Sequence, residues 1–178
     1  GIYSQSAVFL AQARAAGYEG LFMGPDGTDS TEFAAIAGDA AIGTLYTTVA
    51  GPASIYPNAA QFIEDYTEVF GEAPQPFAAQ SYDSTAIAIQ ALQAAIESTG
   101  ALPSRADVSA AVRATADYEG LTGMVTFDAN GDPEIGLYFV IEVLSGEPEE
   151  WSNNEVIATL EIPSPLTAAA MAEATPAS

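Results

Sequence analysis

The sequence predicts an α/β fold in which helices flank sheets of mainly parallel strands. Helix-like and strand-like segments alternate over the first fifty residues, which is the rhythm of a sheet covered by helices. Hydrophobic residues make up 49% of the 178 residues, which is enough for packed cores and too many for a disordered chain. The 15 glycines and 11 prolines are scattered rather than arranged in repeats, so they are expected to mark turns and the ends of helices and strands.

Capping residues and apolar runs set the expected boundaries in the first fifty residues. The predicted elements are a helix capped by Ser4 or Ser6 and ended by Gly17, a strand at 21–23, a helix from Ser30 or Thr31 to Gly38, and a strand at 42–49.

The middle of the chain is predicted to be helical, because its apolar residues recur at helical spacing between two proline-bearing connectors. The expected segments are a connector at 50–57, a helix at 58–70, a connector at 72–76, a long helix at 77–98, and a helix at 105–115 capped by Ser104.

The last third changes to strand-like runs, at 124–127, 137–144 and 156–162. A polar turn joins the first two of these runs. Beyond residue 163 the sequence is small and alanine-rich without an amphipathic face, so we expect a loosely held tail there.

The acidity of the chain excludes several function classes. There are 24 acidic residues against three arginines, for a net charge of −21, which repels phosphate backbones and anionic membrane surfaces. The absence of cysteine and histidine removes thiolate and imidazole metal ligands and every nucleophile–histidine arrangement of catalysis. We therefore expect no enzyme, no metal, no cofactor and no nucleic-acid partner.

The sequence contains no apolar run of the roughly 18 residues that a membrane span needs. It begins without methionine and without a segment typical of a signal peptide, leading directly into a helix-like segment. This pattern favours a chain that belongs to a longer protein.

The loop Gly24-Pro25-Asp26-Gly27 is the first candidate site, because it follows a predicted strand directly. In open α/β sheets, ligands bind outside the carboxyl ends of the strands. Asp26 can accept a charge-assisted hydrogen bond from a cationic group such as an ammonium. Alternatively, Pro-Asp-Gly is ordinary turn chemistry, and Asp26 only braces its own backbone.

Other acidic and aromatic groups have simpler interpretations. The segment at 128–132 lacks the glycine and glutamate positions of a calcium loop and is predicted to be a turn. Neighbouring acids such as Glu149 and Glu150 resemble the carboxylate pairs of glycosidases but fit a solvated face. Tyr82 and Asp83, at the entry of the long helix, either line a cleft or anchor the core.

The order of these segments resembles the second half of the leucine/isoleucine/valine-binding proteins, a family of type I periplasmic binding proteins. The resemblance covers roughly residues 1 to 145. It is carried by Gln-Ala-Arg-Ala-Ala-Gly at 12–17, Phe-Met-Gly-Pro-Asp-Gly at 22–27, Ile-Ala-Gly-Asp-Ala-Ala at 36–41, the helix entry at 77–83, and Gly-Met-Val-Thr-Phe-Asp at 123–128.

The resemblance implies a fragment of a two-lobed fold with a ligand cleft between the lobes. It places residues 1–49 in the second lobe, 50–130 in the first lobe, 131–162 on the return to the second lobe, and 163–178 in the tail. The connector at 50–57 is then a hinge. Helices from 58 to 115 would have lost their first-lobe neighbours, which predicts an exposed apolar face with Phe62, Tyr66, Ile89, Leu92 and Ile96.

The resemblance also implies a site and partners. Asp26 takes the place of the acid that holds the ligand's α-ammonium, and Phe77 matches an aromatic of the side-chain pocket. Ile2, with Tyr3 next to it, stands where relatives carry an aromatic. The expected function is capture of a small amino acid, branched-chain or related, for an ABC importer's membrane subunits.

The protein is then expected to be monomeric when full length, and periplasmic or at the cell surface, with or without a lipid anchor. Two alternatives stay open. The same fold serves ligand-sensing receptors, and the ligand can be an amide or another small organic acid.

Overall fold

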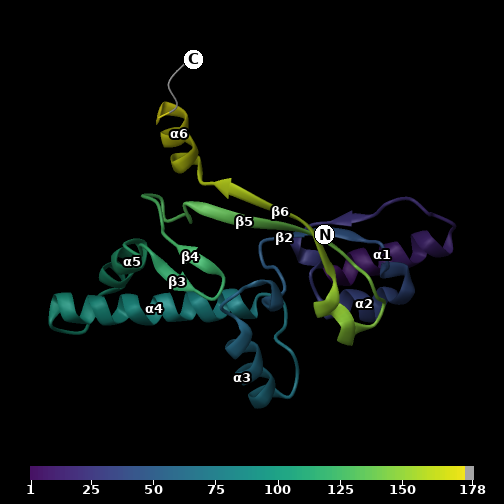
Figure 1. Ribbon diagram of the computed structural model, residues 1–178, viewed down its shortest axis with the longest axis horizontal. Helices are drawn as coiled ribbons and strands as arrows, with labels where there is room; N and C mark the ends of the chain where they lie inside the picture. The colour runs from purple at the N-terminus through teal and green to yellow at the C-terminus, as the bar shows by residue number, and fades with distance from the viewer. Residues whose placement is uncertain (175–178) are drawn as a thin grey trace.

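The computed structural model describes residues 1–174 and arranges their elements in two units. Figure 1 shows the sheet unit, which contains a four-stranded sheet with α1 and α2, beside the helical unit, which contains α3, α4, α5 and a small hairpin. The two units are joined by the chain around residues 50–57 and by the strand that returns after residue 130. Among the described residues, no helix is both long enough and apolar enough to cross a membrane.

The sheet unit is built on strands in the order β1-β2-β5-β6. Its regular elements are α1 (Tyr3–Ala15), β1 (Met23–Gly24), α2 (Thr31–Ala37), β2 (Leu45–Thr48), β5 (Ile135–Glu142) and β6 (Glu155–Pro163), with short 3-10 helices η1 (Asp26–Thr28), η2 (Gly38–Ala41) and η4 (Pro148–Asn153). The alternation of helix and strand predicted from the sequence is confirmed here.

The sheet is mixed, which corrects the expectation of mainly parallel strands. β1 and β2 pair in parallel, with Met23 opposite Leu45, as a strand–helix–strand connection requires. β5 pairs antiparallel with β2, with Tyr46 opposite Ile141, and antiparallel with β6. The reason is the path of the chain: it leaves the sheet at the end of β2, passes through the helical unit, re-enters the sheet at that same end as β5, and turns back through η4 into β6.

The helical unit contains the remaining predicted helices at nearly the predicted positions. Its elements are η3 (Ala53–Ile55), α3 (Ala60–Phe70), α4 (Ala78–Thr99), α5 (Arg105–Arg113), β3 (Tyr118–Gly120) and β4 (Gly123–Val125). Ser104 caps α5 as predicted, in a reciprocal capping box with Asp107. β3 was not predicted, because three residues with a central glutamate give no strand pattern.

Two helix termini differ from the sequence predictions. α1 begins after Ile2, without a side-chain cap, and the Ser6 hydroxyl instead donates to the Ile2 carbonyl. The segment after residue 163 contains α6 (Pro165–Ala174), where no element was predicted; Ser164 accepts a hydrogen bond from the Thr167 N–H and caps it. Alanine has the highest helix propensity, so this cap suffices without an amphipathic face. Residues 175–178 of the predicted tail lie outside the described residues.

Most of the hydrophobic core lies in the sheet unit, between the sheet and its two helices, and it extends to Tyr56, Ala59 and Ala79. Leu10, Phe33 and Ile141 are completely buried. Trp151 in η4 is also buried and stacks on Tyr46, with ring centroids 5.6 Å apart and planes 13° from parallel. This packing fixes the connection between β5 and β6 against the start of α2.

Candidate functional site

Asp26 lies two residues after the end of β1 and is exposed, at the carboxyl end of a sheet strand as predicted. Its Oδ1 accepts a hydrogen bond from the Gly27 N–H at 2.9 Å. The side chain therefore braces its own turn, as the local alternative predicted. The other carboxylate oxygen keeps its acceptor positions, so the brace does not prevent a second, external contact.

Ile2 lies beside this loop. A Cβ atom on Gly27 would stand 2.8 Å from the Gly1 carbonyl oxygen and 3.4 Å from the Ile2 Cα. The structure thus brings the start of the chain against the Asp26 turn, and Ile2 is half exposed there. Tyr3, next to it, is partly buried and packs against the core on one side.

Phe77 lies in the helical unit, at the N-cap of α4, with a left-handed backbone at φ 69°. Its side chain is 38% exposed. The two residues before it, Gln75 and Pro76, line a cavity between the units. Phe77 is therefore one residue away from the place where the two units face each other.

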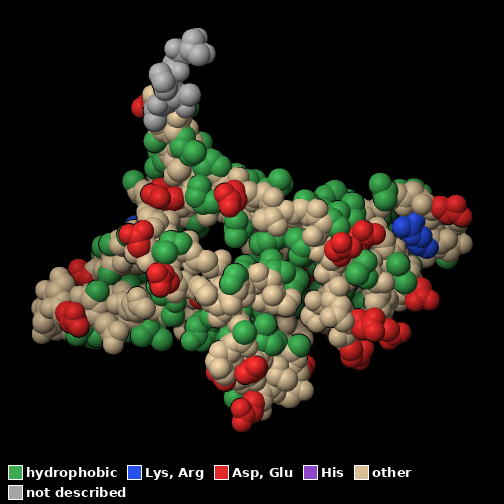
Figure 2. Space-filling view, viewed as in Figure 1, with side chains coloured by type: hydrophobic (Ala, Val, Ile, Leu, Met, Phe, Trp, Pro, Cys, Tyr) green, Lys and Arg blue, Asp and Glu red, His purple; other side chains and the backbone are tan. Residues whose placement is uncertain are grey.

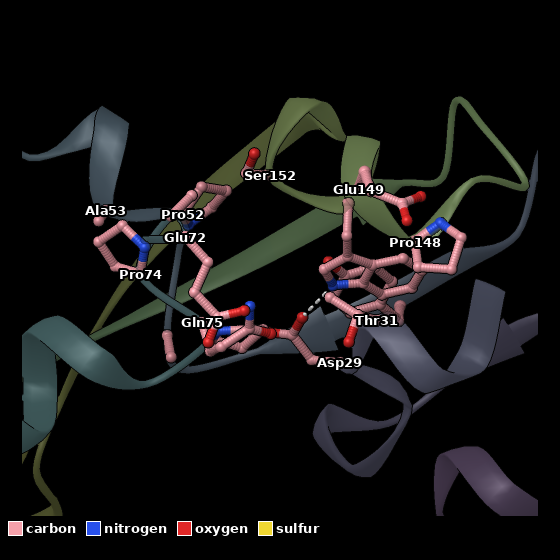
Figure 3. A pocket seen from close by; sticks show the side chains of 15 residues that line it. Asp29, Thr31, Pro52, Ala53, Glu72, Pro74, Gln75, Pro148, Glu149 and Ser152 are labelled. Atoms are coloured by element: carbon pink, nitrogen blue, oxygen red, sulfur yellow. Dashed lines mark hydrogen bonds between the residues drawn. The ribbon is translucent and has the colours of Figure 1, made fainter. Parts of the chain in front are cut away.

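This junction cavity has a volume of about 290 Å³. Its walls come from the start of α2, the connector after β2, the connector before α4, and η4. Figure 3 shows Pro52 and Pro74 on one side and Pro148 and Glu149 on the other, with Asp29 and Gln75 drawn below them. None of the four predicted site residues lines the cavity among the residues the structure describes.

Asp29 is the charged group most deeply set in the junction cavity. The Trp151 Nε1–H donates to its Oδ1 at 2.9 Å. Burial raises the pKa of Asp29, while hydrogen bonds from the side chains of Trp151, Tyr46 and Thr48 oppose that shift, and the nearby charge of Asp26 adds to it. Burial, with the charge of Asp29, likewise raises the pKa of Tyr46.

Sequence reasoning missed Asp29, Gln75 and Trp151. The rule that ligands bind at the carboxyl ends of strands could have found Asp29, because Asp29 follows Asp26 by only three residues. Trp151 carried no signal, since it joins the cavity from 122 residues further along the chain.

A second set of contacts ties the connector after β2 to both units. The Tyr56 hydroxyl accepts hydrogen bonds from the Gly51 N–H at 3.1 Å and from the Gln80 Nε2 at 2.8 Å. Its ring also meets the Phe139 ring edge-on, at 6.4 Å. Tyr56 thus links the connector to α4 and to β5.

The sequence allowed Tyr82 and Asp83 either to line a cleft or to anchor the core, and in the structure the two residues have different environments. Asp83 is 3% exposed and accepts hydrogen bonds from the Leu121 N–H, the Thr122 N–H and the Thr122 hydroxyl. It anchors the β3–β4 turn to α4. Tyr82 is 53% exposed and contacts the Phe62 ring at 5.3 Å.

Helices flank the sheet, two crossing segments join it to a second unit, and a cavity lies at the junction of the two units. The sequence pattern that defines the periplasmic binding proteins matches residues 2–147, and the chain belongs to that family.

Known relatives agree with this assignment. The chain is 26% identical over 152 residues to the Leu/Ile/Val-binding protein homolog 2 of Brucella abortus, covering 85% of this chain and 39% of that protein. The crystal structure of a leucine-binding protein from Thermotoga maritima superposes with a TM-score of 0.73 and 30% identity, over 90% of this chain and 43% of that one.

A branched-chain amino acid transporter substrate-binding protein of Streptococcus pneumoniae, solved with isoleucine, shares the fold, with a TM-score of 0.72, 24% identity, and coverage of 92% of this chain and 43% of that one. The chain thus spans about two fifths of the length of the relatives it matches.

Proposed function

We propose that this chain is part of an extracytoplasmic solute-binding protein that captures a small amino acid, branched-chain or related, for an ABC importer. The observation that carries the proposal is the likeness to the Thermotoga maritima leucine-binding protein, at 30% identity and over 90% of this chain. The protein binds its solute and catalyses no reaction on it. Its partners are the amino acid and the membrane subunits of the importer.

The proposed mechanism is closure of two lobes about a hinge. Residues 1–49 and 131–162 belong to one lobe, 50–130 belong to the other, and the connector at 50–57 bends between them. The hydrogen bonds that Tyr56 accepts from Gly51 and Gln80 support this assignment. They attach the connector to α4, which belongs to the other lobe, whereas β2, just before the connector, belongs to the sheet. Closure buries the solute and presents one shape to the importer.

In the proposed site, Asp26 receives the α-ammonium of the amino acid, and Ile2, Tyr3 and Phe77 contribute to the pocket of its side chain. The exposed position of Asp26 beside Ile2 supports this arrangement. A carboxylate that is buried only on closure rejects ligands without an amine, because it would then be left unpaired. The full-length protein is monomeric and lies in the periplasm or on the cell surface.

The test is a ligand screen on the full-length protein. Thermal-shift measurements against amino acids, amides, sugars and nucleosides, followed by calorimetry, should find a small neutral amino acid that binds with a dissociation constant of roughly 1 μM or lower. Binding of sugars or nucleosides alone would contradict the proposed function.

A further inference from the structure

Asp29 is a carboxylate that no cation of the described chain neutralises. The sequence has three arginines and neither lysine nor histidine. Arg14 donates to the carbonyls of Tyr18 and Gly20, and Arg113 donates to that of Asn130. None of the arginines lines the junction cavity. An unpaired charge away from water is costly, so a cation that enters this cavity from solution gains a partner there.

The carboxylate of Asp29 is held in one orientation. Its bond to Trp151 is anchored by a ring that is 4% exposed and packs against both Tyr46 and Phe33. An ionised carboxylate offers about four acceptor positions. The Trp151 bond, with the nearby Tyr46 and Thr48 side chains, leaves acceptor capacity for an ammonium group.

The rest of the junction cavity suits a small apolar group. Alanines and prolines are seven of its 15 lining residues, Gln75 adds an amide, and Glu72 and Glu149 lie at its exposed rim. Its volume of about 290 Å³ lies at the lower end of the range for small-molecule sites. This size favours a single amino acid over a peptide or a disaccharide.

We propose that Asp29 is a specificity-determining residue that binds the ammonium group of a small apolar amino acid in the junction cavity, with Trp151 positioning its carboxylate. The proposal rests on the proposed function and deepens it. Asp26 and Asp29 stand at the two ends of η1, near enough for the charge of Asp26 to act on Asp29, and of these two carboxylates only Asp29 lines the junction cavity. Trp151 lies beyond residue 147, where the family pattern ends.

The experiment uses the full-length protein and compares Asp29→Asn with Glu97→Gln, which removes an exposed carboxylate from α4. Calorimetry measures leucine, isoleucine, valine and 4-methylpentanoate, which has the carbon skeleton of leucine without its amine. Asp29→Asn should lower the affinity for the amino acids roughly 10- to 100-fold and leave that for 4-methylpentanoate unchanged. Glu97→Gln should change neither.

Trp151→Phe tests whether Trp151 positions the Asp29 carboxylate, while leaving the contact between Asp29 and the ammonium possible. It keeps a ring against Tyr46 and removes the N–H, so amino acid affinity should fall by a smaller factor, roughly 3- to 10-fold. Thermal unfolding of each ligand-free variant shows whether the protein folds. Asp29→Asn should not lower its melting temperature, because an amide oxygen still accepts from Trp151.

The outcomes are distinct. If the wild-type protein binds amino acids and Asp29→Asn binds them equally well, the inference is overturned and the proposed function stands. Equal losses for the amino acids and for 4-methylpentanoate would also overturn it, because they indicate a damaged pocket rather than a lost ammonium contact. If the wild-type protein binds no amino acid, the proposed function itself fails.

Discussion

The carboxylate of Asp26 braces its turn through the Gly27 N–H and remains exposed beside Ile2. The turn needs one acceptor, and an amide oxygen can serve as well as a carboxylate oxygen. A bound ammonium needs the charge. Replacing the acid by its amide therefore separates the two roles that the local sequence left open.

Asp26→Asn should weaken amino acid binding far more than it weakens folding. Losing a charge-assisted contact that closure buries costs about 2–4 kcal/mol, or roughly 30- to 1,000-fold in affinity. Calorimetry and thermal unfolding of the full-length protein measure both quantities, with Glu97→Gln as the matched control. Unchanged affinity in Asp26→Asn would show that Asp26 acts only as a brace, since the amide oxygen still accepts from the Gly27 N–H.

At the scale of elements, the β3–β4 turn is fixed to α4 by one side chain. Asp83 accepts three hydrogen bonds from Leu121 and Thr122. Gly120 leaves room for it, since a Cβ atom there would stand 2.5 Å from the Asp83 Oδ2. The hairpin and the long helix should therefore lose stability together when either residue changes.

Asp83→Ala should lower the free energy of unfolding by about 2–4 kcal/mol, because two partly buried backbone N–H groups lose their charged acceptor. Gly120→Ala should cost about 1–3 kcal/mol by displacing the carboxylate. Urea unfolding of both single variants and the double variant measures the coupling. In the Asp83→Ala background the glycine substitution should cost much less; additive losses would show that the two residues act independently.

The capping box of α5 makes a prediction about pH. Hydrogen bonds from the Ser104 hydroxyl and the Ser104 N–H lower the pKa of Asp107 from its ordinary value of 3.8. Because the folded-state pKa is the lower one, the stabilisation is fully present above pH 3.8 and is lost as the pH falls through the folded-state pKa.

Asp107→Asn should therefore destabilise the chain at pH 6 and lose its effect in acid. Ser104→Ala should cost about 1 kcal/mol, whereas Ser109→Ala, at an exposed position inside the same helix, should not destabilise it. Urea unfolding at a series of pH values checks all three variants. A pH-independent effect of Asp107→Asn would contradict the role of its charge.

At the scale of the whole molecule, the helical unit carries an apolar face that nothing in the described chain covers. Ile89, Leu92 and Ile96 on α4 are 41–55% exposed, as the resemblance predicted, whereas Phe62 and Tyr66 are half-buried. Figure 2 shows hydrophobic side chains at the surface along α3 and α4, with acidic side chains spread over both units.

The 178-residue chain should therefore bind hydrophobic dyes and self-associate. Replacing Ile89, Leu92 and Ile96 by Gln should reduce both effects, while Leu102→Gln, at an isolated site that is 94% exposed, should change neither. Dye fluorescence and sedimentation velocity measure the difference. If the wild-type chain stays monomeric and binds no dye, this apolar face does not drive association.

The sequence by itself determined the local features of this protein. Helical spacing located α3 and α4, Ser104 marked the start of α5, and Gly17, at φ 90°, marked the end of α1. Each of these depends on residues within one or two turns of each other, so a single sequence contains the whole cause. The strand-end rule likewise located the Asp26 loop at the edge of the sheet.

Only the tertiary structure decided the direction of β5, the burial of Asp83 and the walls of the junction cavity. Asp29 meets Trp151 across 122 residues, and Asp83 meets Leu121 across 38. Such partners share neither a helix face nor a strand period, so no local pattern links them. They come together because burying Tyr46, Phe33 and Trp151 in one core draws η4 onto the start of α2, and the cavity forms where that core meets the connectors.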